Sequence, residues 1–189
     1  MNAVTDQEKC FALALAKINE EGILDDFSRM VLRLKNYADP STLEFFFGLL
    51  HPRLEKGLPI VSVPSSTAGK TDSGIVRLAK MLSKPGCGRI DATSCLIRAT
   101  SVKPNHMRGE RGITKHLNSI KVVNRSLIQG QTVILLDDIC STGNTLDACD
   151  QLLMEAGAVE VKQYALLIEA SSVGIKQYEL FMEAAEDEK

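Results

Sequence analysis

Two adjacent carboxylates, Asp137 and Asp138, directly follow an apolar run at residues 132–136. An ionised carboxylate can only accept hydrogen bonds, so such a pair needs hydroxyl donors, as on a ribose, or a divalent cation. Neighbouring side chains of a strand point to opposite faces of the sheet, so shared use of both acids requires the chain to turn here. The pair therefore predicts a sugar or metal site where a buried strand ends.

The segment after the acidic pair has the composition of a phosphate-binding loop. Its glycine permits a left-handed backbone conformation, and its N–H groups, with those that begin the next helix, can converge on an anion. The hydroxyl groups can donate to the same oxygens. The residues predicted to hold a phosphate are Cys140, Ser141, Thr142, Gly143, Asn144 and Thr145. Carboxylates for a sugar beside this loop predict a phosphorylated ribose, bound at both ends.

The segment from Val133 to Thr145 resembles the signature by which type I phosphoribosyltransferases bind 5-phosphoribosyl 1-pyrophosphate (PRPP). The match comprises the apolar run, the acidic pair, an apolar spacer and Thr-Gly-x-Thr. The resemblance implies that Asp137 and Asp138 contact the ribose hydroxyls and lie near an Mg²⁺ ion held mainly by PRPP oxygens. It also implies an enzyme that transfers the phosphoribosyl group to a nitrogen nucleophile, a base or an amine, and releases pyrophosphate.

Within this family the chain resembles the ComF-like group, from Lys35-Asn36-Tyr37 through the loop after Pro64 to Gly157. ComF-like proteins often carry an N-terminal four-cysteine zinc ribbon, which this sequence lacks. Ser141 stands where some purine-using relatives have an aspartate, which argues against hypoxanthine or guanine salvage. The sequence does not specify the acceptor, and a homodimer would be common for the fold.

Two further segments are predicted to act on pyrophosphate. The loop after the strand at 59–64 lies where the family binds pyrophosphate, and the polar stretch at 100–118 corresponds to the family's mobile catalytic loop. Closure of such a loop excludes water and brings cations to the leaving group. The predicted pyrophosphate contacts are Ser65, Ser66 and Lys70, and the candidate catalytic residues are Arg98, Lys103, Arg108 and Arg111. His106 and His116 could act as acids or bases, but loop histidines are more often bystanders.

The elements that must position these residues alternate between strands and helices, which predicts a mostly parallel sheet flanked by helices. The expected architecture is α/β, the type I phosphoribosyltransferase fold with extra N-terminal helices, in one domain of 189 residues. We divide it into a helical part at 1–57, a core at 58–170 and a C-terminal helix at 171–189. The predicted helices are 5–22, 27–37, 41–50, 72–84, 146–157 and 175–185, and the predicted strands are 59–64, 94–99, 119–123, 132–136 and 159–168.

Composition restricts location and partners. The formal charge of −2 and the absence of Trp provide no general surface for nucleic acid. The five cysteines contain no Cys-x-x-Cys pair, which favours a reducing compartment. The apolar stretch at 11–16 is too short for a signal sequence or a membrane span. We therefore expect a cytoplasmic protein without membrane association.

Parts of the sequence also suggest three functions other than a phosphoribosyltransferase enzyme. A P-loop NTPase is suggested by Gly69-Lys70-Thr71 after a strand, but its first glycine would fall at Pro64, which lacks an N–H. A regulator that senses PRPP or nucleotides without turnover remains open, because the same segment would bind the ligand. A DNA-uptake-related protein is suggested by the ComF-like resemblance, but the near-neutral charge gives it no support.

Overall fold

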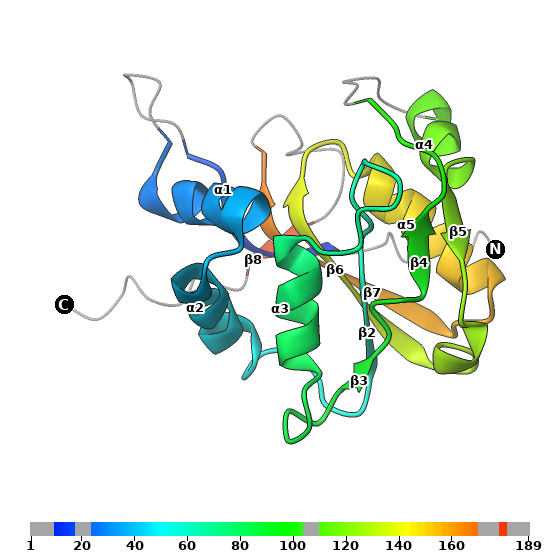
Figure 1. Ribbon diagram of the computed structural model, residues 1–189, viewed down its shortest axis with the longest axis horizontal. Helices are drawn as coiled ribbons and strands as arrows, with labels where there is room; N and C mark the ends of the chain where they lie inside the picture. Colours follow the sequence, from blue (N-terminus) through cyan, green and yellow to red (C-terminus); the bar gives the residue numbers. More distant parts are fainter. Residues whose placement is uncertain (1–9, 18–23, 104–109, 170–177, 181–189) are drawn as a thin grey trace, which may run out of the picture.

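The structure, a computed structural model, describes residues 10–17, 24–103, 110–169 and 178–180. Within these residues six strands form a central sheet in the order β3-β2-β6-β7-β1-β8, and every neighbouring pair is parallel (Figure 1). Two more strands form a separate antiparallel pair. The central strands are β1 (Cys10–Leu15), β2 (Pro59–Ser62), β3 (Ile90–Asp91), β6 (Thr132–Cys140), β7 (Glu160–Ile168) and β8 (Tyr178–Leu180), and the pair is β4 (Leu96–Arg98) and β5 (Ile120–Val122).

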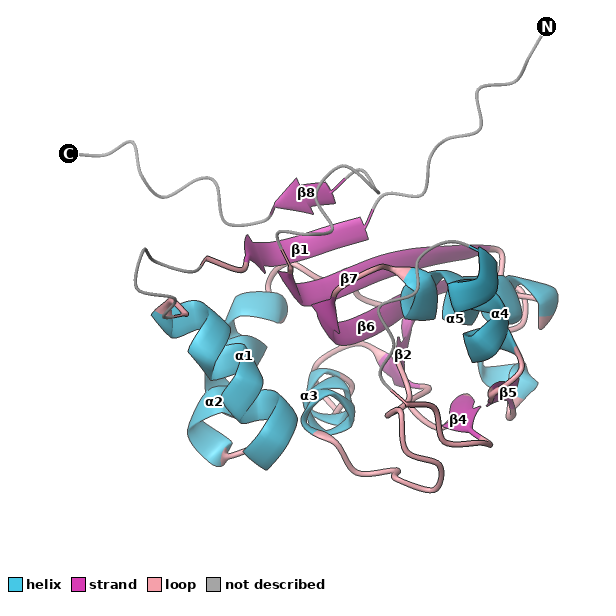
Figure 2. Ribbon diagram, turned by 90° about the horizontal axis from the view of Figure 1, so that it is seen from above, coloured by secondary structure: helices cyan, strands magenta, loops and turns pink. Residues whose placement is uncertain are grey.

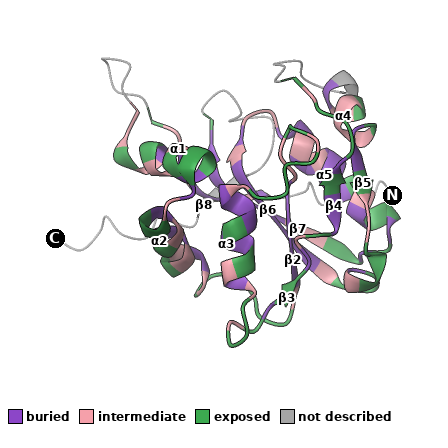
Figure 3. Cartoon of the chain, viewed as in Figure 1, coloured by how far each residue is buried: buried purple, intermediate pink, exposed green. Residues whose placement is uncertain are grey.

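The helices cover both faces of the central sheet, with α1, α2 and α3 on one side and α4 and α5 on the other (Figure 2). Side-chain alternation along β6 explains why both faces need cover: Val133 and Leu135 pack toward α5, whereas Ile134 and Leu136 pack toward α1, α2 and α3. Figure 3 shows β2, most of β6 and part of α3 as buried, whereas β3 at the edge of the sheet is exposed. The helices are α1 (Asp26–Tyr37), α2 (Pro40–Leu50), α3 (Gly74–Leu82), α4 (Glu110–Leu117) and α5 (Asn144–Glu155), with a 3-10 turn, η1, at Arg125–Leu127.

The predicted parallel α/β architecture is confirmed, together with the helices at 27–37 and 41–50 and the strands at 59–64, 119–123, 132–136 and 159–168. Asp25 and Asp39 cap α1 and α2 by accepting from backbone N–H groups of the first turn. Among the described residues, no helix has the length and apolar character needed to cross a membrane.

The predicted helix at 5–22 is wrong where the structure describes it, because Cys10–Leu15 form strand β1. Apolar residues at helical spacing suggested a helix, but the segment is one unbroken apolar run, and such a short run does not distinguish a helix from a buried strand. The outcome was decided by its neighbours, since β1 lies between β7 and β8 and pairs with both. Residues 1–9 and 18–23 lie outside the described part.

The predicted C-terminal helix at 175–185 is also wrong over its described residues. Tyr178–Leu180 form β8, which pairs with Cys10–Ala12 of β1 in parallel register. Pairing with the open edge of β1 satisfies backbone groups that a local sequence pattern does not report. The remainder of the predicted helix is not described.

Three other predictions need correction. The polar stretch at 100–118 contains helix α4, whose residues pack against α5, so tertiary contacts outweigh its polar composition. The predicted strand at 94–99 belongs to the antiparallel pair, and the sheet edge is instead formed by β3, which was not predicted. Helix α3 is capped by Ser73 and not by Asp72, whose carboxylate pairs with Arg77.

Candidate functional site

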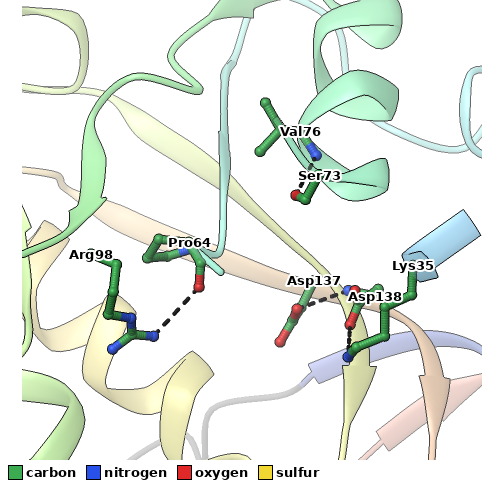
Figure 4. Close-up of polar contacts among 7 residues, drawn as sticks. All are labelled: Lys35, Pro64, Ser73, Val76, Arg98, Asp137 and Asp138. Atoms are coloured by element: carbon green, nitrogen blue, oxygen red, sulfur yellow. Dashed lines mark hydrogen bonds and ion pairs between the residues drawn. The ribbon is translucent and has the colours of Figure 1, made fainter. Parts of the chain in front are cut away.

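The acidic pair lies inside strand β6 and not in a turn after it. Asp137 pairs in register with Ala165 of β7, and the strand continues to Cys140. The prediction that the chain turns at this pair is therefore wrong. Both residues are 9% exposed, and the side-chain oxygen Oδ1 of Asp137 accepts from the N–H of Asp138 at 2.8 Å. Figure 4 shows the Asp138 carboxylate beside Lys35 and the Asp137 carboxylate on the side toward Arg98.

The loop predicted to bind pyrophosphate meets the acidic pair because β2 and β6 are parallel neighbours. Ser62 pairs in register with Leu136, and the N–H of Val63 donates to the carbonyl of Leu136 at 2.9 Å. The loop that leaves β2 therefore begins beside Asp137. In an open parallel sheet, ligands bind at the carboxyl ends of the strands, and these two strand ends lie together.

A cavity of about 360 Å³ opens at this edge of the sheet. It is lined by eight of the residues predicted from the sequence: Ser65, Ser66, Lys70, Arg98, Asp137, Asp138, Ser141 and Thr145. Although the two acids alternate along the strand, both reach the cavity because they lie at the rim and not in the middle of the sheet. The structure thus brings the predicted sugar, phosphate and pyrophosphate contacts to one space.

Other predicted site residues do not line this cavity. Cys140 is buried in the core, Thr142 and Gly143 lie in the turn before α5, and Asn144 is the first residue of that helix. Lys103 is exposed on the chain beyond Ser101. Arg108 lies outside the described residues. Arg111 belongs to α4, and its side chain is not described.

The N-terminus of helix α5 lies at the part of the cavity wall formed by Ser141 and Thr145. Gly143 is its N-cap residue, adopts φ +77° as expected for a left-handed turn, and has no side chain that could cap the helix. The first N–H groups of a helix have no carbonyl partner within it, and the helix dipole adds positive potential there. Thr145, in the first turn of α5, adds a hydroxyl to the cavity wall. This arrangement suits a phosphate group.

Lys35, at the C-terminal end of α1, pairs with the acidic residues and was not predicted as a site residue. Its Nζ lies 2.8 Å from Oδ1 of Asp138. Burial opposes the charged form of Lys35, but the charge of Asp138 and its hydrogen bond, together with the charges of Asp137 and Glu169, outweigh it and raise the lysine pKa above its usual value. The sequence signal was present only as part of the ComF-like segment Lys35-Asn36-Tyr37, and Asn36 also lines the cavity.

Close packing of α1 on α3 sets the position of Lys35. A Cβ atom at Gly74, the first residue of α3, would lie 2.0 Å from the carbonyl oxygen of Leu34. Only glycine permits this approach without movement of one helix. Because Leu34 immediately precedes Lys35, the glycine helps to place the lysine over the acidic pair.

The pKa of Asp137 is raised by its surroundings. Burial first, and then the charge of Asp138, raise the pKa of Asp137 from 3.8 to about 7, while the charges of Lys35 and Arg98 and the Asp138 N–H oppose the rise. Without a ligand, Asp137 is therefore partly protonated near neutral pH. A ligand that donates hydrogen bonds to Asp137 would favour its ionised form.

Arg98 lies at the cavity wall, but its guanidinium is already engaged. Its Nε donates to the carbonyl of Ser65 at 2.9 Å, Nη1 donates to Ser119 Oγ at 2.7 Å, and Nη2 lies 3.4 Å from the carbonyl of Pro64. The residue is 6% exposed, and burial lowers the pKa of the guanidinium. The contacts with Ser65 and Pro64 hold the predicted pyrophosphate loop in place, and Figure 4 shows the one with Pro64. The geometry thus favours a positioning function for Arg98.

The same loop is tied to the start of the 100–118 segment. The N–H of Val102 donates to the carbonyl of Ser66 at 2.9 Å, and Ser101 Oγ accepts from the N–H of Ala68 at 2.9 Å. The sequence predicted both segments as parts of one site but did not predict these bonds.

His116, in the last turn of α4, also reaches the site. Its Nδ1 lies 3.5 Å from Arg98 Nη1, and its Nε2 lies 3.3 Å from the hydroxyl of Thr145. Burial, together with the charges of Arg98 and Lys115, lowers the pKa of His116 to about 4. The imidazole is therefore neutral near pH 7. The sequence suggested His116 only as a possible acid or base and more often a bystander, because nothing in its local pattern links it to the phosphate loop.

The acidic pair can contribute to a metal site only with help from a ligand. Among residues 10–17, 24–103, 110–169 and 178–180, no group of three or more His, Cys, Asp or Glu side chains could hold a metal ion. Mg²⁺ is commonly bound by one or two carboxylates together with water and substrate phosphate oxygens. Asp137 and Asp138 fit that mode.

Comparison with known proteins shows similarity to one family. The family model described as phosphoribosyl transferase domain matches residues 68–182. Adenine phosphoribosyltransferase from Rhodospirillum rubrum is 29% identical over 122 residues, 64% of this chain and 66% of the relative. Ribose-phosphate pyrophosphokinase from Pyrococcus furiosus is 29% identical over 130 residues, 69% of this chain and 42% of the relative. The chain thus spans less than two thirds of the length of each. A crystal structure of adenine phosphoribosyltransferase aligns with a TM-score of 0.44 and 18% identity, covering 82% of this chain and 83% of that one.

Proposed function

The chain belongs to the family of phosphoribosyl transferase domains, and on this premise we propose that it transfers the phosphoribosyl group of Mg²⁺-PRPP to a nitrogen nucleophile, with release of pyrophosphate. One observation carries the proposal: a single cavity joins the carboxylates of Asp137 and Asp138 to Ser141 and Thr145 at the N-terminus of α5. The same cavity therefore offers acceptors for sugar hydroxyls and donors for a phosphate. PRPP has both groups on one ribose.

The ribose end is assigned to the acidic pair. Sugar hydroxyls donate to Asp137 and Asp138, and these bonds favour the ionised form of Asp137, whose pKa is otherwise raised to about 7. Lys35 balances part of the negative charge through Asp138. The phosphate end is assigned to the hydroxyls of Ser141 and Thr145 and to the first N–H groups of α5.

The pyrophosphate is assigned to the loop after β2. Ser65 and Ser66 offer donors, and Lys70 is the cation of this loop that faces the cavity. Negative charge grows on the pyrophosphate as the bond to the ribose breaks, so a cation held there stabilises the transition state. Arg98 holds this loop in position by donating to the backbone carbonyls of Ser65 and Pro64. Lys103, Arg108 and Arg111 remain candidates from the sequence for cations that approach the leaving group.

Magnesium is proposed to lie beside Asp137 and Asp138, where it would neutralise charge on the bound pyrophosphate group. The chain supplies two carboxylates, and oxygens of PRPP and water complete the coordination. No further protein ligand is needed for this mode of binding.

The finer assignments are also proposals. Membership of the ComF-like group is supported by the position of Lys35 and Asn36 at the cavity, since both belong to the segment that carried the resemblance. A cytoplasmic location is supported by the five cysteines, all of which are free thiols. The acceptor is a base or an amine, and a homodimer is the expected assembly.

The test is binding followed by turnover. Mg²⁺-PRPP should raise the melting temperature of the protein, and pyrophosphate should be released with at least one member of a panel of bases and amines. The double variant Asp137→Asn/Asp138→Asn should lose the shift, whereas Asp26→Asn, which changes a carboxyl that is 93% exposed, should keep it. An undiminished shift in the double variant would overturn the site assignment. A shift without release of pyrophosphate for any acceptor would support a PRPP sensor, and salt-dependent binding of DNA would support the DNA-uptake alternative.

A further inference from the structure

His116 connects two parts of the site that are distant in the sequence. It belongs to α4, and it contacts Arg98 of β4 on one side and Thr145 of α5 on the other. Arg98 in turn holds the carbonyl of Ser65 in the predicted pyrophosphate loop. A continuous chain of polar contacts therefore runs from the pyrophosphate loop through the imidazole to the phosphate loop.

The chemistry of the partners determines the tautomer of His116. A guanidinium has only donors, so Nδ1, which faces Arg98, must be the acceptor. A neutral imidazole with an accepting Nδ1 carries its hydrogen on Nε2. The pKa of about 4 keeps the ring neutral near pH 7. The Nε2–H therefore donates to the hydroxyl oxygen of Thr145.

This donation has a consequence for Thr145. A threonine hydroxyl has one hydrogen, and its oxygen can accept from others. Because the imidazole donates to the oxygen, the hydroxyl hydrogen is not used toward His116 and can be donated to a group in the cavity that Thr145 lines. A hydroxyl held in this way is a preorganised donor for an anion. The opposite tautomer would set two donors against each other at Arg98.

We propose that His116 is a positioning residue that orients the hydroxyl of Thr145 as a donor to the phosphate of the bound substrate. The inference rests on the proposed function for the identity of that substrate. His116 is not a general acid or base in this scheme, since both ring nitrogens already contact protein groups, Arg98 and Thr145. It acts through Thr145, and its contact with Arg98 sets its tautomer.

The experiment uses a matched pair of variants. In His116→Asn the short amide occupies the place of Nδ1, keeps an acceptor for Arg98 and loses the donor to Thr145. In His116→Gln the longer amide reaches the place of Nε2 and can restore that donor. We expect His116→Asn to weaken binding of Mg²⁺-PRPP about 5- to 10-fold, by calorimetric titration, and His116→Gln to remain within about twofold of wild type.

A double-variant cycle separates positioning from a general structural effect. Thr145→Val removes the hydroxyl, so adding His116→Asn to it should weaken binding by less than about twofold further. Equal loss in both backgrounds, or wild-type affinity in His116→Asn, would overturn the proposal. A melting temperature lowered by both His116 variants with unchanged affinity would also overturn it, since the role would then be structural only.

Ribose 5-phosphate, titrated in parallel, keeps failure of this proposal distinct from failure of the proposed function. It presents the same phosphate without pyrophosphate. If wild type binds ribose 5-phosphate but not PRPP, and His116→Asn weakens that binding about 5- to 10-fold, the proposed function fails and the positioning role stands. If wild type binds neither ligand, both proposals fail.

Discussion

We expect the ionisable carboxyl of Asp137, which is placed for ligand binding, to lower the free energy of unfolding of the protein without a ligand. Asp137 is 9% exposed, and burial with the nearby charge of Asp138 raises its pKa from 3.8 to about 7. Ionising this group in the folded protein without a ligand is therefore unfavourable. Asp137→Asn removes the ionisable group but keeps the side-chain oxygen that accepts from the N–H of Asp138. We expect the variant to be more stable than wild type at neutral and higher pH.

The size of the effect follows from proton linkage. Between pH 3.8 and about 7 the folded wild type binds more protons at Asp137 than the unfolded chain, so the free energy of unfolding falls as pH rises through this window. The free energy of unfolding falls by at most about 1.4 kcal/mol for each pH unit in this window, so the total decrease is about 4 kcal/mol once the pH is above 7. The new amide NH₂ costs about 1 kcal/mol if it finds no acceptor, and this cost does not depend on pH. The change with pH is therefore the informative quantity.

The assay is urea unfolding of both proteins at about pH 5, 6, 7 and 8. The stability of Asp137→Asn relative to wild type should increase by roughly 2 to 4 kcal/mol across that range. Asp26→Asn, which alters a carboxyl that is 93% exposed, serves as the control and should change stability by under about 0.5 kcal/mol throughout. A difference between Asp137→Asn and wild type that is constant at every pH would refute the reasoning.

Three further predictions concern the framework of the site. Gly74→Ala should lower the free energy of unfolding by more than about 2 kcal/mol, because its Cβ would lie 2.0 Å from the carbonyl oxygen of Leu34. Gly48→Ala is the control, because a Cβ there would meet nothing within 4 Å, and it should be neutral or slightly stabilising. Equal effects of the two variants in urea unfolding would contradict this prediction. Arg89→Met should lower the free energy of unfolding by about 3 kcal/mol, because the buried guanidinium donates to five backbone carbonyls near the ends of α2 and α3, those of His51, Leu54, Glu55, Leu82 and Cys87. The affinity for Mg²⁺-PRPP should stay near that of wild type, and a decrease in stability below about 1 kcal/mol would count against this prediction. Lys35→Met should raise the pKa of Asp137 further, by about one pH unit, because the lysine charge lowers that pKa. Titrations of the variant with Mg²⁺-PRPP at about pH 7 and 9 should then show a larger loss of affinity at the lower pH, and an equal loss at both would exclude this explanation.

Local sequence was sufficient for the segments in which neighbouring residues decide the outcome. Residues 133–136, just before Asp137, include no polar side chain that could face water, so they predict a strand covered on both sides, and β6 is such a strand. The left-handed conformation of Gly143 and the helix after it were predictable for the same reason. Failure began where the partners are distant: residues 10–15 have a helical spacing of apolar side chains, but pairing with β7 and β8 makes them a strand.

The site divides in a similar way. Sequence reasoning identified the residues of the cavity that come from the ends of β2 and β6, because their types carry recognisable chemistry. It named Arg98 as a catalytic candidate at the end of a strand, and the structure shows the guanidinium bonded to the carbonyls of the loop after β2. It named His116 only as a possible acid or base and did not predict its contacts with Arg98 and Thr145, which join three separate elements.

By itself, the sequence determined which chemical groups are present and in what local order: two acids at the end of a buried strand, then a glycine turn and a helix that leaves its N–H groups free for an anion. Only the tertiary structure decided what those groups touch. Lys35 and Asp138 are 103 positions apart, and their ion pair exists because α1 packs on α3 and on the sheet. The raised pKa of Asp137 and the contacts of His116 and Arg98 all depend on such distant neighbours, because electrostatic interactions act through space and not along the chain.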